Sequence, residues 1–431
     1  MITLVCDPPP IELSAACTAK GRNISGAEQV GPPPPALVAL DDALGMILRH
    51  AKPSRIECVR LDQAGGRILA QPVVSLRAAP GCDVSAMDGY AVCDADLVGD
   101  CVVLEVVGES FAGRPPKGRL RRGSAMRIFT GAALPAGTDR VVLQENVQRD
   151  GRFVSLSAQP KGKTNIRLTG SDFCQGEVLV PAGLRLTPAR VMAAAGADLA
   201  EVMVFARPVV TILPTGDELR PPGAQGADAA SIPESVSFGV AELARNLGAE
   251  VSVLPHLPDE LGMLQEAARH MTANSDIVVI IGGASVGERD CSRQMFDRER
   301  VQLHFSKVAM RPGKPVWFGS AGKAHVIGLP GNPAAALIAA RLFLAPLIAG
   351  LSGLSPQAVL DWRLRPLADP LEPTHSLDCL LAARHRGDGV EVFANRDSSA
   401  QRAISAIEVL VRRRPHAAAA MAGDFVETLE F

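Results

Sequence analysis

The hydrophobic pattern of the chain begins with a segment that has no sustained period. This segment, residues 1–36, ends in a proline-rich run and is predicted to be a flexible leader. A helix is predicted next, because apolar residues recur at steps of three and four from Leu40 to Ala51. Asp41 or Asp42 is expected to cap the first turn of that helix.

The pattern then changes to short apolar runs that are divided by Gly and Pro. These runs, between residues 77 and 165, predict a β-rich domain. Short strands follow over 166–206, together with a helix that is expected to begin at Thr187-Pro188. Thr is a favoured N-cap residue, and Pro is favoured at the first helical position.

Strands and amphipathic helices alternate in the next part of the chain. Apolar strands are predicted at 209–213, 251–254, 277–281 and 326–327. Fully apolar strands between amphipathic helices are buried on both faces, so the pattern predicts a three-layer α/β/α domain with a mainly parallel sheet. Ligands of such sheets bind at the carboxyl ends of the strands. The tail, 353–431, again holds short strands and predicts a C-terminal β-barrel-like domain.

Composition narrows the classes of function. The net charge of −2 gives no overall field that would hold nucleic acid or an anionic membrane, and an aromatic content of 4% offers few stacking platforms for bases. The nine cysteines form no CxxC pair and no Cys/His cluster, so a zinc site is not expected. With no signal peptide pattern and no uninterrupted apolar run of about 18 residues, we expect a cytoplasmic protein without a membrane span.

Candidate chemistry gathers where the strands of the predicted sheet end. Asp217 and Glu218 follow the first strand. Two adjacent carboxylates repel each other unless a cation or a hydrogen-bond donor compensates their charge. Gly282 and Gly283 end the third strand and allow backbone amides to turn inward around an anion. Ser285 can add a hydroxyl there, and Asp290 a carboxylate. The alternative is an ordinary glycine-rich turn.

Two more segments offer positive charge near the same sheet edge. Arg311 and Lys314 lie in a stiff Arg-Pro-Gly-Lys-Pro loop and can face an oxyanion, although a solvated basic loop is the alternative. The run 328–333 begins a helix, with Asn332 as a natural N-cap and Pro333 as its first residue. The free amides and the dipole of that helix predict an anion site, and a plain helix cap is the alternative.

The β-rich domain holds two weaker motifs. Asp88 stands beside a glycine in the run 85–91, and an ordinary Asp-Gly turn is the default interpretation of it. Thr130 follows a short strand and can offer its hydroxyl to a phosphate or to metal-bound water. Taken together, the motifs suit a metal-assisted reaction between an oxyanion and a phosphate-bearing ligand. Carboxylates would hold Mg²⁺ and cations would neutralise the oxyanion.

Six motifs in order resemble the MoeA/gephyrin E-domain family of molybdopterin molybdenumtransferases. They read SAMDGYAV, IFTGAALPAGTDRVV, LPTGDEL, GGASVGERD, VAMRPGKPVWFG and GLPGNP. The resemblance runs from about 37 to 431 and is strong over 80–350. It implies an elongated four-domain subunit that follows the leader. Its parts are a linker domain formed by 37–76 and 166–206, the β-rich domain 77–165, a molybdopterin-binding-like α/β domain 207–352, and the C-terminal domain 353–431.

The resemblance also implies an activity and partners. The enzyme would insert molybdate into adenylylated molybdopterin, with Mg²⁺, and would release AMP. The cleft would lie in a head-to-tail homodimer, between the α/β domain of one subunit and the β-rich domain of the other. A molybdopterin adenylyltransferase would supply the substrate, and molybdoenzyme chaperones are candidate partners for delivery.

The resemblance and the motifs together give a set of candidate site residues. The catalytic candidates are Asp88, Thr130, Asp172, Glu218 and Lys314. The metal candidates are Glu218, Asp259 and Asp290. The substrate-binding candidates are Gly282, Gly283, Ser285, Arg311, Pro330, Gly331, Asn332, Pro333 and Ser398. Asp88 and Thr130 would reach across the dimer, and Lys314 would face molybdate.

Some positions depart from the family pattern. The triplet 234–236 reads Glu-Ser-Val where Asp-Ser/Thr-Asn is usual, and Ala335 stands where a serine is common. Leu381 occupies the place of an expected arginine, although Arg384 is close; Ser398 fits the pattern of the tail. These departures motivate a second hypothesis, a diverged paralogue that binds or delivers the pterin cofactor without efficient metal insertion. A purely structural scaffold is a third.

Overall fold

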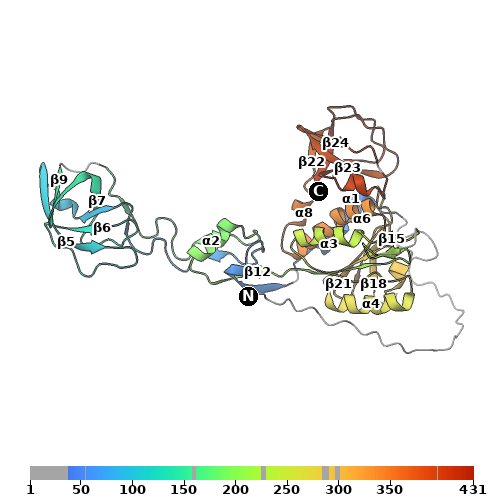
Figure 1. Cartoon of the computed structure of the whole chain (residues 1–431), viewed down its shortest axis with the longest axis horizontal. Helices are drawn as coiled ribbons and strands as arrows, with labels where there is room; N and C mark the ends of the chain where they lie inside the picture. The colour runs from blue at the N-terminus through green and yellow to red at the C-terminus, as the bar shows by residue number, and fades with distance from the viewer. Residues whose placement is uncertain are drawn as a thin grey trace.

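The chain is elongated and has its domains in a row. The computed structural model describes residues 37–53, 55–157, 162–224, 230–283, 291–296, 301–395 and 397–431, so the predicted leader lies outside the described part. Figure 1 shows the β-rich domain at one end and a small linker domain in the middle. The α/β domain and the C-terminal domain pack together at the other end.

A six-stranded sheet forms the centre of the α/β domain, in the order β16-β13-β17-β21-β20-β18. The parallel strands are β16 (Glu250–Val253), β13 (Val209–Pro214), β17 (Ile277–Ile281) and β21 (Ala324–Leu329). The antiparallel strands at one edge are β20 (Trp317–Ala321) and β18 (Val301–Phe305). The predicted mainly parallel sheet is therefore confirmed, with an antiparallel edge that the apolar pattern did not indicate.

Helices cover both faces of this sheet. One face carries α1 (Leu40–His50), α3 (Val236–Asn246) and the helix that begins with α6 (Pro333–Ala339). The other face carries α4 (Leu261–Asn274). Successive side chains of a strand point to opposite faces, so Ile212 joins the first core and Leu213 the second. This explains why the central strands are largely apolar, and why β17 is apolar at every position.

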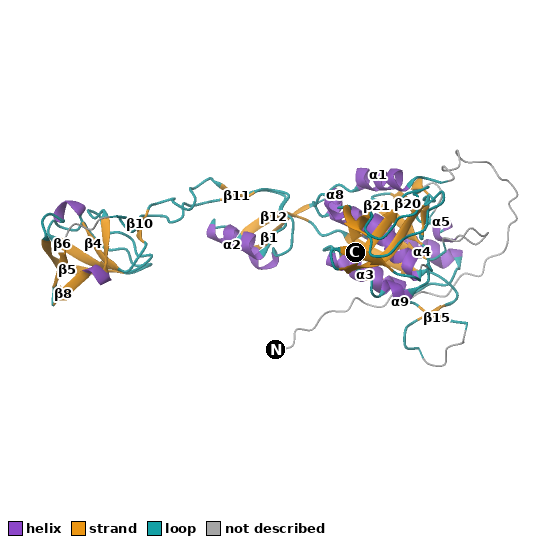
Figure 2. Cartoon of the chain, turned by 90° about the horizontal axis from the view of Figure 1, so that it is seen from above, coloured by secondary structure: helices purple, strands orange, loops and turns teal. Residues whose placement is uncertain are grey.

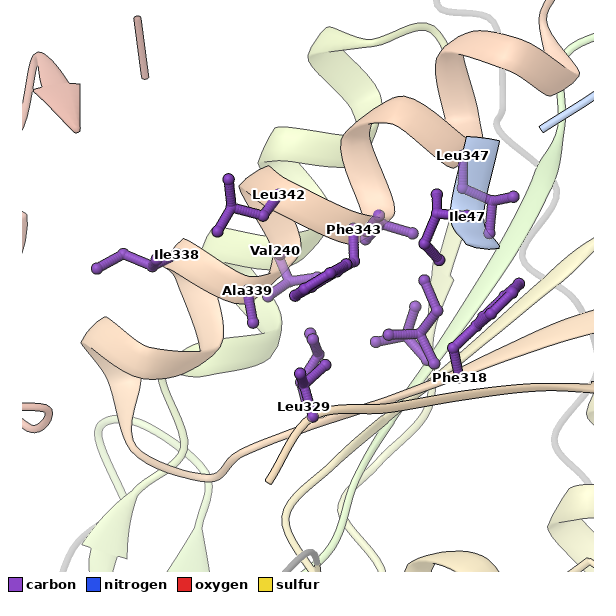
Figure 3. Packing of buried hydrophobic residues seen from close by; sticks show 14 of the residues in the cluster. Ile47, Val240, Phe318, Leu329, Ile338, Ala339, Leu342, Phe343 and Leu347 are labelled. Atoms are coloured by element: carbon purple, nitrogen blue, oxygen red, sulfur yellow. The ribbon is translucent and has the colours of Figure 1, made fainter. Parts of the chain in front are cut away.

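The helix after β21 is long, apolar and internally irregular. It continues from α6 through a π-helical turn, η4 (Ala340–Leu344), into α7 (Ala345–Leu351). Pro346 has no N–H and its ring would collide with a carbonyl one turn earlier, so the wider π turn accommodates it. The stretch Pro333–Leu351 is long and apolar enough to cross a membrane, but 94% of it is buried inside the domain. Figure 3 shows its side chains packed against the sheet, so it is a core helix.

The β-rich domain contains a second six-stranded sheet, β7-β4-β6-β5-β9-β8. Its strands are β4 (Gly89–Val92), β5 (Cys101–Ser110), β6 (Ser124–Ile128), β7 (Arg140–Leu143), β8 (Val147–Asp150) and β9 (Phe153–Ser157). The linker domain pairs segments from both sides of this insertion. They are β1 (Ile56–Arg60) with β12 (Glu201–Phe205), and β2 (Val73–Val74) with β11 (Val178–Val180).

The C-terminal domain is a curved sheet that includes a strand from the α/β domain. Its order is β19-β23-β25-β26-β22, and β24 also pairs with β23. The strands are β19 (Met310–Arg311), β22 (Arg363–Pro366), β23 (Asp378–Arg386), β24 (Gly389–Val392), β25 (Val409–Arg413) and β26 (Phe425–Glu430). A bridge between Leu367 and Val390 brings the end of β22 beside β24, which closes the sheet in the barrel-like manner expected.

Two predicted helix starts had different outcomes. Thr187 caps α2 (Pro188–Gly196), with its hydroxyl accepting the N–H of Arg190 at 3.4 Å, as predicted. The predicted cap of α1 is wrong, because Ala39 is the N-cap and no side chain bonds the first turn. Asp41 instead accepts from Arg412 at 2.7 Å and from Arg414 at 3.0 Å. These bonds join α1 to the C-terminal domain.

Candidate active site

A cavity of about 810 Å³ lies at the carboxyl ends of the parallel strands. Thr215 follows β13, Gly282 follows β17 and Pro330 follows β21, and all three line it. Glu218 and Lys314 line the same cavity. Four of the segments singled out from the sequence therefore converge, although they are far apart along the chain. The 328–333 turn contributes Pro330, Gly331, Asn332 and Pro333.

The acidic side of the cavity depends on a tight turn after β13. Gly216 has a φ of +149°, a backbone conformation that residues with a Cβ rarely adopt, so glycine suits this turn. Glu218 is exposed and lines the cavity. Asp217 points elsewhere and its Oδ1 accepts the backbone N–H of Asp259 at 3.1 Å. This bond places Asp259 beside the same turn, although Asp259 is not among the residues that line the cavity.

The glycine pair after β17 does not present both of its amides to an anion. Gly282 has a φ of +96°, and a Cβ there would lie 2.4 Å from the carbonyl oxygen of Thr215. Its N–H donates to the carbonyl of Leu329 at 3.1 Å, which uses the amide to extend the sheet. Gly283 also has a positive φ and lines the cavity. The companion candidates Ser285 and Asp290 lie outside the described residues.

The start of α6 is already satisfied by the protein itself, which corrects the expectation of free amides. Pro333 has no N–H, and the N–H groups of Ala334 and Ala335 donate to the carbonyl of Ser398 at 3.0 and 3.3 Å. Asn332 is the N-cap residue, but its side chain makes no capping bond. Its Nδ2 donates to the hydroxyl of Ser398 at 3.2 Å. An anion would gain these helix amides only if Ser398 moved.

Cations line the cavity in greater number than the sequence indicated. Lys314 is joined by Lys307, which follows β18, and by Arg293 on the short helix α5 (Cys291–Gln294). The carbonyl of Lys314 accepts the N–H of Val308 at 3.0 Å, which fixes its loop. Neither Lys307 nor Arg293 belongs to a recognisable motif, so only the folded sheet brings them here. Arg311 does not join this group, because β19 carries it into the C-terminal sheet and it lines a second cavity.

The divergent triplet 234–236 has a structural role at the wall of the cavity. Glu234 is 6% exposed; its Oε1 accepts the N–H of Ser237 at 2.8 Å and its Oε2 accepts the Ser237 hydroxyl at 2.6 Å. The carboxylate therefore holds the first turn of α3, and it also lines the cavity. Ser235 accepts from Gln401 at 2.9 Å, which ties the triplet to the C-terminal domain. Val236 lines the cavity as an apolar side chain.

The remaining catalytic candidates lie away from this cavity. Thr130 donates both its N–H and its hydroxyl to Oδ1 of Asp88, each at 2.8 Å. The backbone N–H is the main reason that the pKa of Asp88 lies below its ordinary value. Both residues belong to the β-rich domain, which lies at the other end of the elongated molecule from the α/β domain (Figure 2). Asp172 is exposed in the loop before β11, where its N–H donates to Ala79 at 3.0 Å.

Comparison with known proteins agrees with this architecture. Residues 38–197 match the MoeA N-terminal region (domain I and II), and residues 211–350 match a probable molybdopterin binding domain. A molybdopterin molybdenumtransferase of Haemophilus influenzae is 38% identical over 320 residues, which are 74% of this chain and 78% of that protein. The chain belongs to the molybdopterin molybdenumtransferase family.

Other proteins of this family also match most of the length of the chain. A molybdopterin molybdenumtransferase of a Nostoc species is 39% identical over 306 residues, 69% of this chain and 70% of that protein. The crystal structure of a molybdopterin biosynthesis MoeA protein from Pyrococcus horikosii superposes with a TM-score of 0.81 at 26% identity. The superposition covers 91% of this chain and 99% of the Pyrococcus horikosii chain. The chain is thus a transferase of molybdenum cofactor biosynthesis with the fold of its family.

Proposed function

We propose that this transferase inserts molybdate into adenylylated molybdopterin, with Mg²⁺, and releases AMP. The observation that carries the proposal is the convergence of Glu218, Lys314 and the 330–333 turn on one cavity at the carboxyl end of the parallel sheet. Its volume of about 810 Å³ is within the usual range for a small-molecule site. The family membership supports the same chemistry.

Oxygen donors suited to Mg²⁺ line the acidic side of the cavity. Within the described ranges, no group of three or more His, Cys, Asp or Glu side chains is arranged to hold a metal ion. Mg²⁺ is commonly held by one or two carboxylates, water and substrate phosphates, so Glu218 fits this role together with a phosphate-bearing ligand. Asp259 and Asp290 are the further ligands that we propose. The ion would neutralise charge on the phosphate of the departing AMP.

Basic side chains supply the opposite charge. Lys314 and Lys307 line the cavity and would neutralise the oxyanion and the ligand phosphates. The wall behind them is rigid, because Trp317 is 1% exposed and its Nε1 donates to the hydroxyl of Ser292 at 3.3 Å. A rigid wall keeps the shape of the cavity beside these cations when charge develops.

A second subunit would complete the site. Asp88 and Thr130 lie in a domain that extends away from their own cavity, so a head-to-tail homodimer would bring them to the cavity of the partner. The double hydrogen bond from Thr130 lowers the pKa of Asp88 and keeps its carboxylate ionised. We also place the enzyme in the cytoplasm, where a molybdopterin adenylyltransferase would supply its substrate.

The function is tested by turnover with defined components. Purified protein, adenylylated molybdopterin, molybdate and Mg²⁺ should release AMP and yield cofactor that activates an apo-molybdoenzyme. Binding of adenylylated molybdopterin without AMP release would instead favour the diverged paralogue. Ala335→Ser discriminates further: a large gain in activity would support that alternative, whereas an unchanged rate would show that Ala335 is compatible with insertion.

A further inference from the structure

A further cavity, of about 220 Å³, lies where the linker domain meets the α/β domain, and we call it the junction cavity. The linker domain lines it with the turn 65–68, with Arg185 and with Phe205 at the end of β12. The α/β domain lines it with the C-terminal end of α3 and with the chain that follows α7. Val236, at the start of α3, lines the main cavity, so the two cavities lie at opposite ends of a helix of 11 residues, about 16 Å long. The junction cavity is therefore separate from the proposed active site.

The two domains are in close contact beside the junction cavity. Gly353, just after α7, lies so near the ring of Phe205 that a Cβ there would come within 1.9 Å of it. The turn 65–68 instead faces open space. Gly66 lines the cavity with a φ of +78° and, apart from its chain neighbours, no heavy atom lies within 4 Å of the place that a Cβ would occupy. The contact at Phe205 holds the walls together, while the bare turn leaves room for a ligand.

Arginines supply all the charged side chains in the wall of the junction cavity. Among the described residues, the lining includes no Asp, Glu, Lys or His, and its arginines are Arg67, Arg185, Arg207 and Arg245. Two of their guanidinium groups are fixed at the wall by carbonyls of other lining residues. Nη2 of Arg67 donates to the carbonyl of Phe205 at 2.9 Å, and Nη1 of Arg185 donates to the carbonyl of Gly66 at 3.1 Å. Like charges around one small cavity repel each other, so an anion between them would be stabilising.

The protein neutralises only part of this positive charge. Glu57 pairs with Arg67, and the carboxylate of Glu242 lies 3.8 Å from the guanidinium of Arg245. The other two arginines of the cavity form no ion pair within the described ranges. The helices α3 and α7 both end at the cavity, and each helix end contributes roughly half a negative charge. About one positive charge is therefore left over, which suits a small anion with one or two negative charges.

We propose that the junction cavity binds inorganic phosphate between Arg185 of the linker domain and Arg207 at the start of the α/β domain. A planar guanidinium presents paired N–H donors that match the oxygen atoms of phosphate. Small-molecule sites usually measure about 300–1,000 Å³, so a cavity of about 220 Å³ suits a free phosphate ion better than a nucleotide. The bound ion would bridge the two domains. It would therefore restrict the angle between the α/β domain and the arm that the linker domain and the β-rich domain form.

The test is binding of inorganic phosphate to the full chain at low ionic strength, measured by isothermal titration calorimetry. The double variant R185Q/R207Q should weaken binding by at least about tenfold, as expected for the loss of charged hydrogen bonds. R114Q/R121Q, at two exposed positions of the β-rich domain, changes the net charge equally and should bind like the wild type. R185K/R207K keeps the charges and should retain part of the affinity, which guards against misfolding of the glutamine variant. Phosphate should also raise the Tm of the wild type and of R114Q/R121Q, but not that of R185Q/R207Q.

Three outcomes would overturn the inference. They are no binding of phosphate by the wild type, equal affinity in the wild type and R185Q/R207Q, and equal losses of affinity in R185Q/R207Q and R114Q/R121Q. The single variants Arg185→Gln and Arg207→Gln test the bridge, because each should weaken binding. A loss confined to one of them would contradict an ion held between the two domains. None of these measurements requires AMP release, so the phosphate site and the proposed function can fail independently.

Discussion

Protonation of His325 is expected to destabilise the α/β domain at acid pH. This ring, on β21, packs against His50 and Phe318 with centroids 5.6 and 5.9 Å away, and its Nδ1 is buried without a hydrogen-bond partner in the described part of the chain. Burial is the main cause that lowers its pKa from 6.5 to about 4. His50 and His304 lower the pKa further, and Asp276 opposes them. The folded state therefore takes up a proton less readily than the unfolded chain.

The direction and the size of the change in stability follow from the difference between the pKa of His325 in the folded and in the unfolded chain. With a folded pKa below the unfolded one, the stabilisation is complete above about pH 6.5 and is lost as the pH falls toward 4. One pKa unit corresponds to about 1.4 kcal/mol, so the full difference sets a limit of about 3 kcal/mol, of which about 2 would be lost by pH 5. Solvent screens a partly exposed ring, so we expect a loss of about 1 kcal/mol at pH 5.

Urea unfolding, followed by the fluorescence of the two tryptophans, measures the effect. Between about pH 7.5 and about pH 5, the wild type should lose about 1 kcal/mol more than His325→Leu, which cannot take up the proton. His270→Leu, at an exposed position on α4, is the matched control and should keep the pH dependence of the wild type. The same loss of stability in wild type and His325→Leu would refute the reasoning.

Three further predictions address the packing, the divergent triplet and the shared site. Gly328→Ala should lower the free energy of unfolding by about 3 kcal/mol, because a Cβ there would lie 1.8 Å from Nε1 of Trp317; a loss below about 1 kcal/mol in urea unfolding would contradict this. Glu234→Ala should cost about 1–2 kcal/mol in the same assay, through loss of the α3 cap, and an unchanged midpoint would show that the cap is dispensable. Mixing inactive Asp88→Asn with inactive Glu218→Gln should restore about a quarter of wild-type AMP release, because each mixed dimer keeps one intact site. No recovery in verified mixed dimers would argue against a cavity shared between subunits.

The sequence predicted those parts of the site that depend on local pattern. Apolar runs followed by Gly, Pro and polar residues located the ends of β13, β17 and β21, and these ends bring Glu218 and the 330–333 turn to one cavity. Periodicity likewise located α1, and the Thr187-Pro188 pair located the start of α2. Such signals are local because they reflect turn chemistry and the face that each element buries.

Contacts between domains could not be predicted in the same way. Ser398 occupies the amides at the start of α6 although it follows Asn332 by 66 residues. Arg311 and Lys314 belong to one short loop but line different cavities, because β19 pairs with the C-terminal sheet. Nothing in the spacing of these residues indicates such pairings. The order of motifs identified the family, but the destination of each side chain required the fold.

The pairing of β3 (Val84–Ser85) with β10 (Ile166–Arg167) makes the β-rich domain a self-contained insertion in the chain. Ser85 pairs directly with Ile166, so the chain enters and leaves this domain at neighbouring points, and two strands of backbone run together toward the linker (Figure 2). A unit whose ends meet can be excised, lengthened or exchanged without altering the order of the remaining chain. Evolution can therefore tune how far the arm that carries Asp88 extends while the sheet that carries Glu218 stays as it is.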